Sequence, residues 1–262
     1  MSSQWLQLAV DAAREAGNVI LGFYHRDLPV ERKDDGSPLT LADRAAHQII
    51  AARLEATGVP VVSEEGGSLH LDARRYWLVD PLDGTKDFLA GNDEFTVNIA
   101  LVEAQKPVLG VVYAPALDEL YAGEPGKTSW YAKAGARTEC IADGQAPCLR
   151  VAVSRFHDHP DVEVFAQANG VCLRVPMGSA LKYGRLALGD VDVFPRLVGS
   201  SEWDTAAGQA VLEAAGGRVL DWSTGESLRY GKEKRRNPRL LALRAPYRFA
   251  DFKLKQYGPE LL

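Results

Sequence analysis

Two apolar runs near the middle of the chain, 96–102 and 108–113, place the strongest constraint on its fold. Both are rich in β-branched residues, and a loop that contains Pro107 joins them. β-branched side chains favour strands, and two such runs joined by a short loop are typical of a hairpin. The runs 120–123 and 129–133 are expected to continue the same sheet.

Helices are expected before this hairpin, and an alternating pattern after it. Apolar residues recur at helical spacing from Trp5 to Phe23, and a second helix is expected at 42–56. After residue 149, short apolar runs alternate with helical patterns, which indicates an α/β arrangement. The expected strands are 59–63, 76–79, 149–154, 173–175, 191–194 and 218–221, and the expected later helices are 162–169, 180–188 and 205–215. A soft boundary at 145–150 divides the chain into 1–148 and 149–262.

Composition excludes several classes of protein. Of 262 residues, 46% are apolar and 25% charged, and the net charge of −5 gives no general attraction to nucleic acids or acidic membranes. No run is long enough to span a bilayer, and the N-terminus has no secretory pattern. The three cysteines, Cys140, Cys148 and Cys172, form an odd set without metal-ligand spacing, so free thiols and a cytoplasmic location are expected.

The segment Asp80-Pro81-Leu82-Asp83-Gly84-Thr85 is the main candidate for chemistry. A buried strand, 77–79, delivers two carboxylates to its end, and holding them together is costly without a cation. Oxygen ligands select Mg²⁺, Ca²⁺ or Mn²⁺ over zinc. Residues from Thr85 onward can start a helical turn whose free N–H groups suit a phosphate.

This segment could equally be a polar turn in which Asp80 caps the next helix, and taken alone its spacing favours that interpretation. Two further acidic positions weigh against it. Glu64 ends another short strand, and Asp204 precedes a helix of small residues. Asp204 could be a simple N-cap, yet a carboxylate at a helix start also points towards a cleft.

Taken together, these segments resemble the metal-binding signatures of the inositol monophosphatase superfamily. The resemblance rests on Glu64, on 80–85 and on Trp203-Asp204 with the following Ala-Ala-Gly, and it runs from the N-terminal helix to about Asn237. It implies a layered αβαβα sandwich and a lithium-sensitive phosphatase that uses two or three Mg²⁺ ions. The wording of 76–86, 94–101, 110–115 and 178–182 is most similar to the CysQ-type 3′(2′),5′-bisphosphate nucleotidases.

The resemblance also implies roles for single residues. Glu64, Asp80, Asp83, Asp204 and the backbone carbonyl of Leu82 correspond to metal ligands, and Glu64, Leu82, Asp83 and Asp204 also lie at the substrate. Asp43 would orient the Thr85 hydroxyl, which positions the attacking water, while N–H groups of Gly84 and Thr85 hold a phosphate oxygen. Local sequence alone favours another role for Asp43, that of a first-turn residue stabilised by the helix dipole.

The residues expected around the rest of the substrate are Ser179, Lys182, Arg196 and His157. Ser179 and Lys182 lie near the start of a predicted helix and would hold a second phosphate, with help from Arg196, while His157 would lie near the nucleotide. For the basic residues a solvated surface position is nearly as consistent with the sequence. The cluster 232–236 is expected to be a charged surface loop.

The expected reaction is hydrolysis of adenosine 3′,5′-bisphosphate to AMP and phosphate, with the 3′-phosphosulfate donor of sulfur assimilation as a second substrate. One alternative is the same metal chemistry on inositol or another sugar phosphate. Another is a non-catalytic sensor of a phosphorylated metabolite, which would have little need for Asp43 and Thr85. A monomer is expected rather than a homodimer, and any membrane association would be peripheral.

Overall fold

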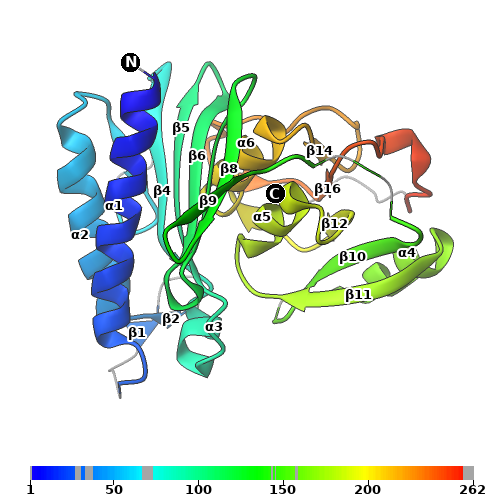
Figure 1. The fold of residues 1–262 in the computed structure, drawn as a ribbon, viewed down its shortest axis with the longest axis horizontal. Helices are drawn as coiled ribbons and strands as arrows, with labels where there is room; N and C mark the ends of the chain where they lie inside the picture. Colours follow the sequence, from blue (N-terminus) through cyan, green and yellow to red (C-terminus); the bar gives the residue numbers. More distant parts are fainter. Residues whose placement is uncertain are drawn as a thin grey trace.

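The computed structural model describes residues 2–26, 31–32, 38–66, 73–142, 144, 146–156 and 159–255. The helices are α1 (Ser2–Phe23), α2 (Leu41–Glu55), α3 (Thr85–Ala90), α4 (Pro160–Ala168), α5 (Leu181–Leu188) and α6 (Ala206–Ala214). Three single turns of 3₁₀ helix occur at Pro115–Leu117, Glu202–Asp204 and Phe249–Asp251. Layers of helices alternate with β-sheets, as Figure 1 shows.

The first sheet has seven strands in the order β3-β4-β5-β6-β7-β8-β9. These are β3 (Val61–Ser63), β4 (Arg75–Asp83), β5 (Thr96–Glu103), β6 (Lys106–Ala114), β7 (Glu119–Glu124), β8 (Thr128–Lys133) and β9 (Ala136–Glu139). The expected central hairpin is confirmed, because β5 and β6 pair antiparallel with Ile99 opposite Val111. Only the β3–β4 pair in this sheet is parallel among the described strands.

The second sheet has five strands in the order β11-β10-β12-β16-β14. These are β10 (Leu149–Ser154), β11 (Val171–Met177), β12 (Val193–Arg196), β14 (Arg218–Asp221) and β16 (Leu240–Leu243). Two short pairs lie outside the main sheets: β1 (Glu31–Arg32) with β2 (Pro38–Leu39), and β13 (Ser200–Ser201) with β15 (Arg236–Asn237). The soft boundary near 145–150 falls between β9 and β10.

Three apolar cores separate the layers. Along β4, Trp77 and Val79 pack with α1 and α2, whereas Tyr76 and Leu78 face the other way and join the core around α5 and α6. Alternate residues of β16 divide in the same manner, because Leu240 belongs to the α5–α6 core and Leu241 to a third core that contains α4. Strands buried on both faces form continuous apolar runs, as both sheets do here. The layers are therefore α1–α2, sheet, α5–α6, sheet and α4, which is the expected αβαβα order.

Helix α6 lies unusually close to the first sheet. A Cβ atom at Gly110 would lie 2.4 Å from the Ala207 carbonyl oxygen, and one at Gly123 would lie 2.8 Å from the Val211 Cα. Both glycines therefore leave space that any other residue would fill. The backbone of α6 rests directly on β6 and β7, and the turn that precedes α6 carries Asp204.

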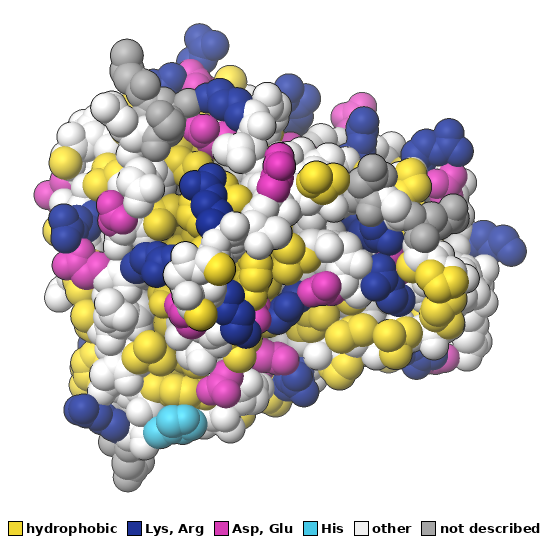
Figure 2. Space-filling model, in the orientation of Figure 1, with side chains coloured by type: hydrophobic (Ala, Val, Ile, Leu, Met, Phe, Trp, Pro, Cys, Tyr) yellow, Lys and Arg dark blue, Asp and Glu magenta, His cyan; other side chains and the backbone are white. Residues whose placement is uncertain are grey.

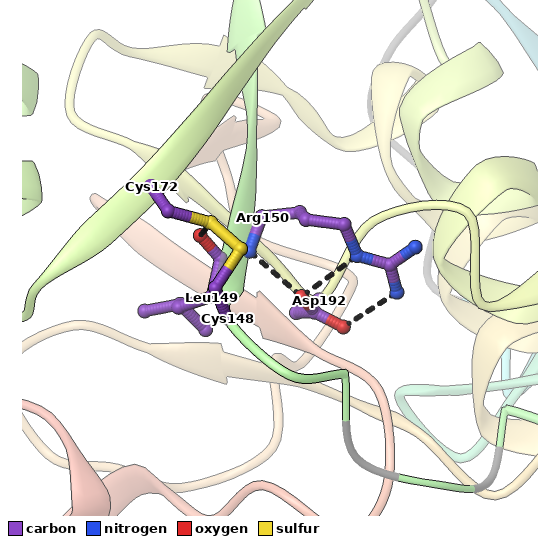
Figure 3. The surroundings of a disulfide bond; sticks show 5 residues. All are labelled: Cys148, Leu149, Arg150, Cys172 and Asp192. Atoms are coloured by element: carbon purple, nitrogen blue, oxygen red, sulfur yellow. Dashed lines mark hydrogen bonds and ion pairs between the residues drawn. A yellow bond between two sulfur atoms is a disulfide. The ribbon is translucent and has the colours of Figure 1, made fainter.

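The expectation of three free thiols is wrong. Cys148 and Cys172 form a disulfide with their Cα atoms 5.9 Å apart, as Figure 3 shows, and only Cys140 among the described cysteines is free. Their separation of 24 residues hides this proximity in the sequence. Because β10 and β11 run parallel and α4 connects them, the starts of both strands lie at one edge. Burial raises the pKa of the remaining Cys140 thiol to about 11.

The surface agrees with the modest net charge. Figure 2 shows Lys and Arg side chains interspersed with Asp and Glu over the face in view. Across the part of the chain that the structure describes, none of the helices combines the length and the apolar character that a bilayer crossing needs.

Candidate active site

A cavity of about 450 Å³ opens between the end of β4 and the second half of the chain. Most residues expected at the site line it, namely Glu64, Asp80, Leu82, Asp83, Gly84, Thr85, Ser179, Lys182, Arg196 and Asp204. They come from both halves of the sequence. His157 lies outside the described residues, so the structure gives no position for it.

A bulge in β4 brings Asp80 and Asp83 to the same side of the sheet. Asp80 pairs with Asn98 and Asp83 pairs with Thr96, so three steps along β4 match two along β5. In a regular strand, residues three apart point to opposite faces. The extra residue of a bulge makes Asp80 and Asp83 point to the same face. The Asn98 amide donates to the Asp83 carboxylate at 3.2 Å, which fixes its direction. Both carboxylates therefore face the cavity.

Glu64 and Asp204 add two carboxylates from other elements. Glu64 directly follows β3, and its N–H donates to the Val79 carbonyl at 3.1 Å, which holds it beside β4. Asp204 ends the 3₁₀ turn before α6, where its carboxylate accepts a hydrogen bond from the Ser201 N–H at 2.9 Å. Asp204 is therefore not the N-cap of α6 that the sequence suggested, because Thr205 takes that position; it caps the 3₁₀ turn instead, and its side chain also lines the cavity.

Burial raises the pKa of two of the grouped acids, Asp204 and Asp83. Burial, followed by the negative charges of Asp83 and Glu64, raises the pKa of Asp204 to about 7. Burial also raises the pKa of Asp83, although Lys182 and Asn98 oppose the effect. A divalent cation would remove this cost, and oxygen donors of this kind are those that Mg²⁺ prefers. Among the described residues, no three His, Cys, Asp or Glu side chains converge into a closed coordination shell, so an ion would have to draw these acids together.

Asp43 and Thr85 are in contact. The Thr85 hydroxyl donates to Asp43 Oδ1 at 3.4 Å, and the other carboxylate oxygen accepts from the N–H and hydroxyl of Thr40. Asp43 is buried, with 1% of its surface exposed. It therefore fills both of the roles that the sequence offered, as a residue that stabilises the start of α2 and as a partner of Thr85. Its effect on an attacking water stays a prediction.

Lys182 is buried within the cavity wall rather than exposed at the surface. Only 3% of its surface is accessible, and its ammonium group donates to the Met177 carbonyl at 3.0 Å. Burial, together with the positive charge of Arg196, lowers the pKa of Lys182 to about 8. Arg196 is half-buried and donates to the Ser154 hydroxyl at 3.2 Å. Ser179 lines the same wall immediately before α5.

The fold and these acids can now be compared with known proteins. The inositol monophosphatase family matches residues 1–245. The chain belongs to this family. Among solved structures, CysQ from Bacteroides thetaiotaomicron superposes with a TM-score of 0.83 at 36% identity, covering 93% of this chain and 98% of the other. The Thermotoga maritima inositol monophosphatase superposes with a TM-score of 0.75 at 26% identity, covering 93% and 92%.

Curated relatives within the family carry a common name. The 3′(2′),5′-bisphosphate nucleotidase CysQ of Salmonella typhimurium is 43% identical over 232 residues, which cover 86% of this chain and 93% of the relative. The protein of the same name from Escherichia coli K12 is 43% identical over 225 residues, covering 83% and 90%. The similarity therefore spans nearly the whole length of both relatives.

This family member has cavity residues that the sequence analysis missed. The expectation of a charged surface loop at 232–236 holds for Glu233, Lys234 and Arg236, which are exposed, but is wrong for Arg235. Arg235 is buried with 2% exposure and pairs with Glu202 at 3.1 Å, while Arg236 lines the cavity. One feature of the sequence could have indicated this difference. Arg235 and Arg236 are adjacent and directly precede Asn237, and adjacent residues in a strand point to opposite sides.

Arg155 and Phe156 also line the cavity and were not expected there. They directly follow β10, and Arg155 forms an ion pair with Glu94 at 2.8 Å. The same Glu94 carboxylate accepts from the Gly178 N–H at 2.7 Å, so it connects the loops after β10 and β11. Sequence gave no local sign of this, because Glu94 and Arg155 are far apart in the chain.

Proposed function

We propose that this chain is a Mg²⁺-dependent phosphoric monoester hydrolase that converts adenosine 3′,5′-bisphosphate into AMP and phosphate. One observation carries the proposal: a group of carboxylates and a set of cationic side chains line one cavity. Such a cavity suits a substrate with two anionic groups. Relatives that are 43% identical to the chain over the aligned residues bear the name of this nucleotidase.

Glu64, Asp80, Asp83, Asp204 and the carbonyl of Leu82 are the residues that would hold Mg²⁺. When bound, the ions neutralise phosphate oxygens and lower the pKa of a bound water. The Thr85 hydroxyl, held by Asp43, orients the attacking water for in-line displacement. The water oxygen bonds to phosphorus as the bond to the ribose 3′ oxygen breaks, and that oxygen leaves with a proton.

The second phosphate of the substrate is held by the basic and polar residues of the same cavity. Lys182 and Arg196 supply positive charge there, and the Ser179 hydroxyl supplies a hydrogen-bond donor. Their low exposure favours a strong interaction, because water screens a buried charge less than an exposed one. These residues distinguish a bisphosphate from a substrate that carries one phosphate.

The proposal also covers the number of metal ions, a second substrate, the oligomeric state and the location of the enzyme. Two or three Mg²⁺ ions take part, the 3′-phosphosulfate donor is a second substrate, and the protein works as a cytoplasmic monomer. Any membrane association is peripheral. Ion counting by calorimetry and mass determination in solution address the first and third of these points directly.

Phosphate release from adenosine 3′,5′-bisphosphate and from inositol 1-phosphate tests the proposal. With Mg²⁺ present, we expect the nucleotide to be hydrolysed with the higher kcat/KM, and EDTA to abolish release from both. A clear preference for the inositol ester would replace the nucleotidase by a sugar phosphatase. Tight nucleotide binding without turnover of any phosphoester would instead indicate a sensor.

A further inference from the structure

Arg196 and Arg236 line the cavity in a similar way. The guanidinium of Arg196 donates through one Nη to the Ser154 hydroxyl at 3.2 Å, and that of Arg236 donates through one Nη to the Ser201 hydroxyl at 3.1 Å. Neither arginine forms an ion pair with a carboxylate of the described chain. A guanidinium carries five N–H donors, so both have donors left over for a ligand.

Arg155 provides a contrast at the same cavity. Its guanidinium donates twice to the Glu94 carboxylate, at 3.1 and 2.8 Å, so a negative charge already compensates its own. Arg236 has only a neutral hydroxyl as its partner. In a protein of net charge −5, an uncompensated arginine in the wall of a cavity is a feature that a negatively charged ligand would exploit.

The backbone that carries Arg236 is firmly held. Arg236 pairs with Ser201 in the short β13–β15 ladder. The preceding Arg235 is buried against Glu202, and the following Asn237 donates to the Ser201 carbonyl at 2.6 Å and to the Thr205 hydroxyl at 2.9 Å. Fixing both neighbours and one Nη lowers the entropy lost when a ligand binds. The arginine is therefore preorganised although its side chain is exposed.

Ser201 also connects Arg236 to the acidic side of the cavity. Its hydroxyl accepts from Arg236, while its N–H donates to Asp204 Oδ2 at 2.9 Å. The hydrogen bond to Ser201 directs one edge of the guanidinium at a neutral group rather than at the Asp204 carboxylate. The acids and Arg236 line the same cavity. When one phosphate of a substrate lies among the acids, Arg236 is therefore available to its other phosphate.

We infer that Arg236 is a specificity-determining residue that binds the phosphate that is not cleaved, through the two-pronged contact that guanidinium groups make with phosphate. This inference rests on the proposed function, since it needs a substrate with a second phosphate. Arg236 extends the set formed by Ser179, Lys182 and Arg196 with an arginine from a different strand pair.

The test compares Arg236→Gln with wild type on adenosine 3′,5′-bisphosphate and on adenosine 3′-phosphate, which lacks the second phosphate. We expect kcat/KM for the bisphosphate to fall about 30-fold or more, because a loss of that size is typical of one hydrogen bond to a charged group and the proposed contact has two. For adenosine 3′-phosphate it should stay within about twofold. Arg236→Lys should give an intermediate loss, because it keeps the charge but not the fork.

A matched control is Arg229→Gln. Arg229 is an exposed arginine that lies seven residues earlier, outside the cavity lining, and its loss removes the same charge from the protein. Both substrates should keep wild-type kinetics in this variant. Melting temperatures of all three variants should match wild type within about 2 °C, given the usual small effect of surface substitutions.

Calorimetric titration gives a readout that is independent of turnover. Arg236→Gln should weaken binding of AMP, which carries only the 5′-phosphate, and leave binding of adenosine 3′-phosphate unchanged. A loss for adenosine 3′-phosphate alone would place Arg236 at the cleaved phosphate, an equal loss for both ligands would place it at the nucleoside that they share, and no loss for either would place it outside the site. Each of these results overturns the inference, while wild-type nucleotide turnover upholds the proposed function. Wild-type turnover of inositol 1-phosphate without nucleotide turnover would overturn both.

Discussion

Asp43 divides its carboxylate between Thr40, which starts α2, and Thr85, which lies at the cavity: Oδ2 accepts from Thr40 at 2.6 Å and Oδ1 accepts from Thr85 at 3.4 Å. The residue thereby links the first helical layer to the end of β4. Because Asp43 contributes to the helix start, its replacement would confuse stability with catalysis. Thr85 is the better position at which to probe this contact.

Thr85→Val should lower kcat by about 100-fold or more, the usual contribution of a group that orients or activates water. Valine keeps the shape but removes the hydroxyl, so the melting temperature should change little. Thr85→Ser serves as the control and should keep most of the activity. Comparable kcat values for Thr85→Val and Thr85→Ser would remove Thr85 from the mechanism.

Asp83→Asn should abolish Mg²⁺-dependent activity with little effect on folding. Burial already disfavours the ionised Asp83 carboxylate, as its raised pKa indicates, so a neutral amide of the same shape costs no stability. Activity and urea unfolding without Mg²⁺ are the two measurements. Near-normal turnover would contradict a role for Asp83 as a metal ligand.

Without metal, Asp204 should make stability depend on pH. Its pKa is raised in the folded state from 3.8 to about 7, so between these values the folded protein binds more protons than the unfolded chain. The free energy of unfolding then falls as pH rises through this window. Asp204→Asn lacks this dependence, so the stability advantage of the variant over wild type in EDTA should grow from pH 4 to pH 7. A constant difference would show that the Asp204 carboxylate is already compensated.

Lys182→Met should raise the KM for adenosine 3′,5′-bisphosphate more than the KM for adenosine 3′-phosphate. Methionine fills the buried space of the lysine stem, and the Met177 carbonyl keeps a hydrogen bond from the Arg155 N–H at 3.2 Å. The loss therefore reports on the charge more than on packing. Equal increases for both substrates would indicate that Lys182 does not contact the second phosphate.

Removing the Cys148–Cys172 disulfide should destabilise the protein without changing its kinetics. The bond closes a loop of 24 residues, and loss of such a constraint costs about 3 kcal/mol of unfolding free energy. Cys172→Ser can be compared with wild type in urea, with Cys140→Ala as the control that leaves the disulfide intact. In denaturant without reductant, one thiol of wild type should react; three reactive thiols would mean that the bond is absent.

Local patterns predicted much of the fold and of the acidic site. The β-branched runs of β5 and β6 and the apolar residues of α1 depend on neighbours in sequence, so their periodicity was sufficient. The αβαβα order and the roles of Asp80, Asp83 and Asp204 came from resemblance rather than from periodicity. The structure adds the physical reason, a bulge that turns Asp80 and Asp83 to one face.

Other features depend on contacts between distant segments. Arg235 was expected in a solvated charged loop, because no neighbouring residue in the sequence indicates its ion pair with the buried carboxylate of Glu202. The Cys148–Cys172 bond depends on two parallel strands starting at one edge. Strand β16 was also not predicted. It pairs with β12, and this pairing places Leu240 opposite Arg196.

The glycines at 110 and 123 decide how firmly the two sides of the cavity are spaced. At these glycines α6 touches β6 and β7 through backbone atoms, so the helix that follows Asp204 packs directly on the sheet to which β4, with Asp80 and Asp83, also belongs. A single methyl group at either glycine would force α6 away from the sheet and so shift Asp204 relative to Asp80 and Asp83.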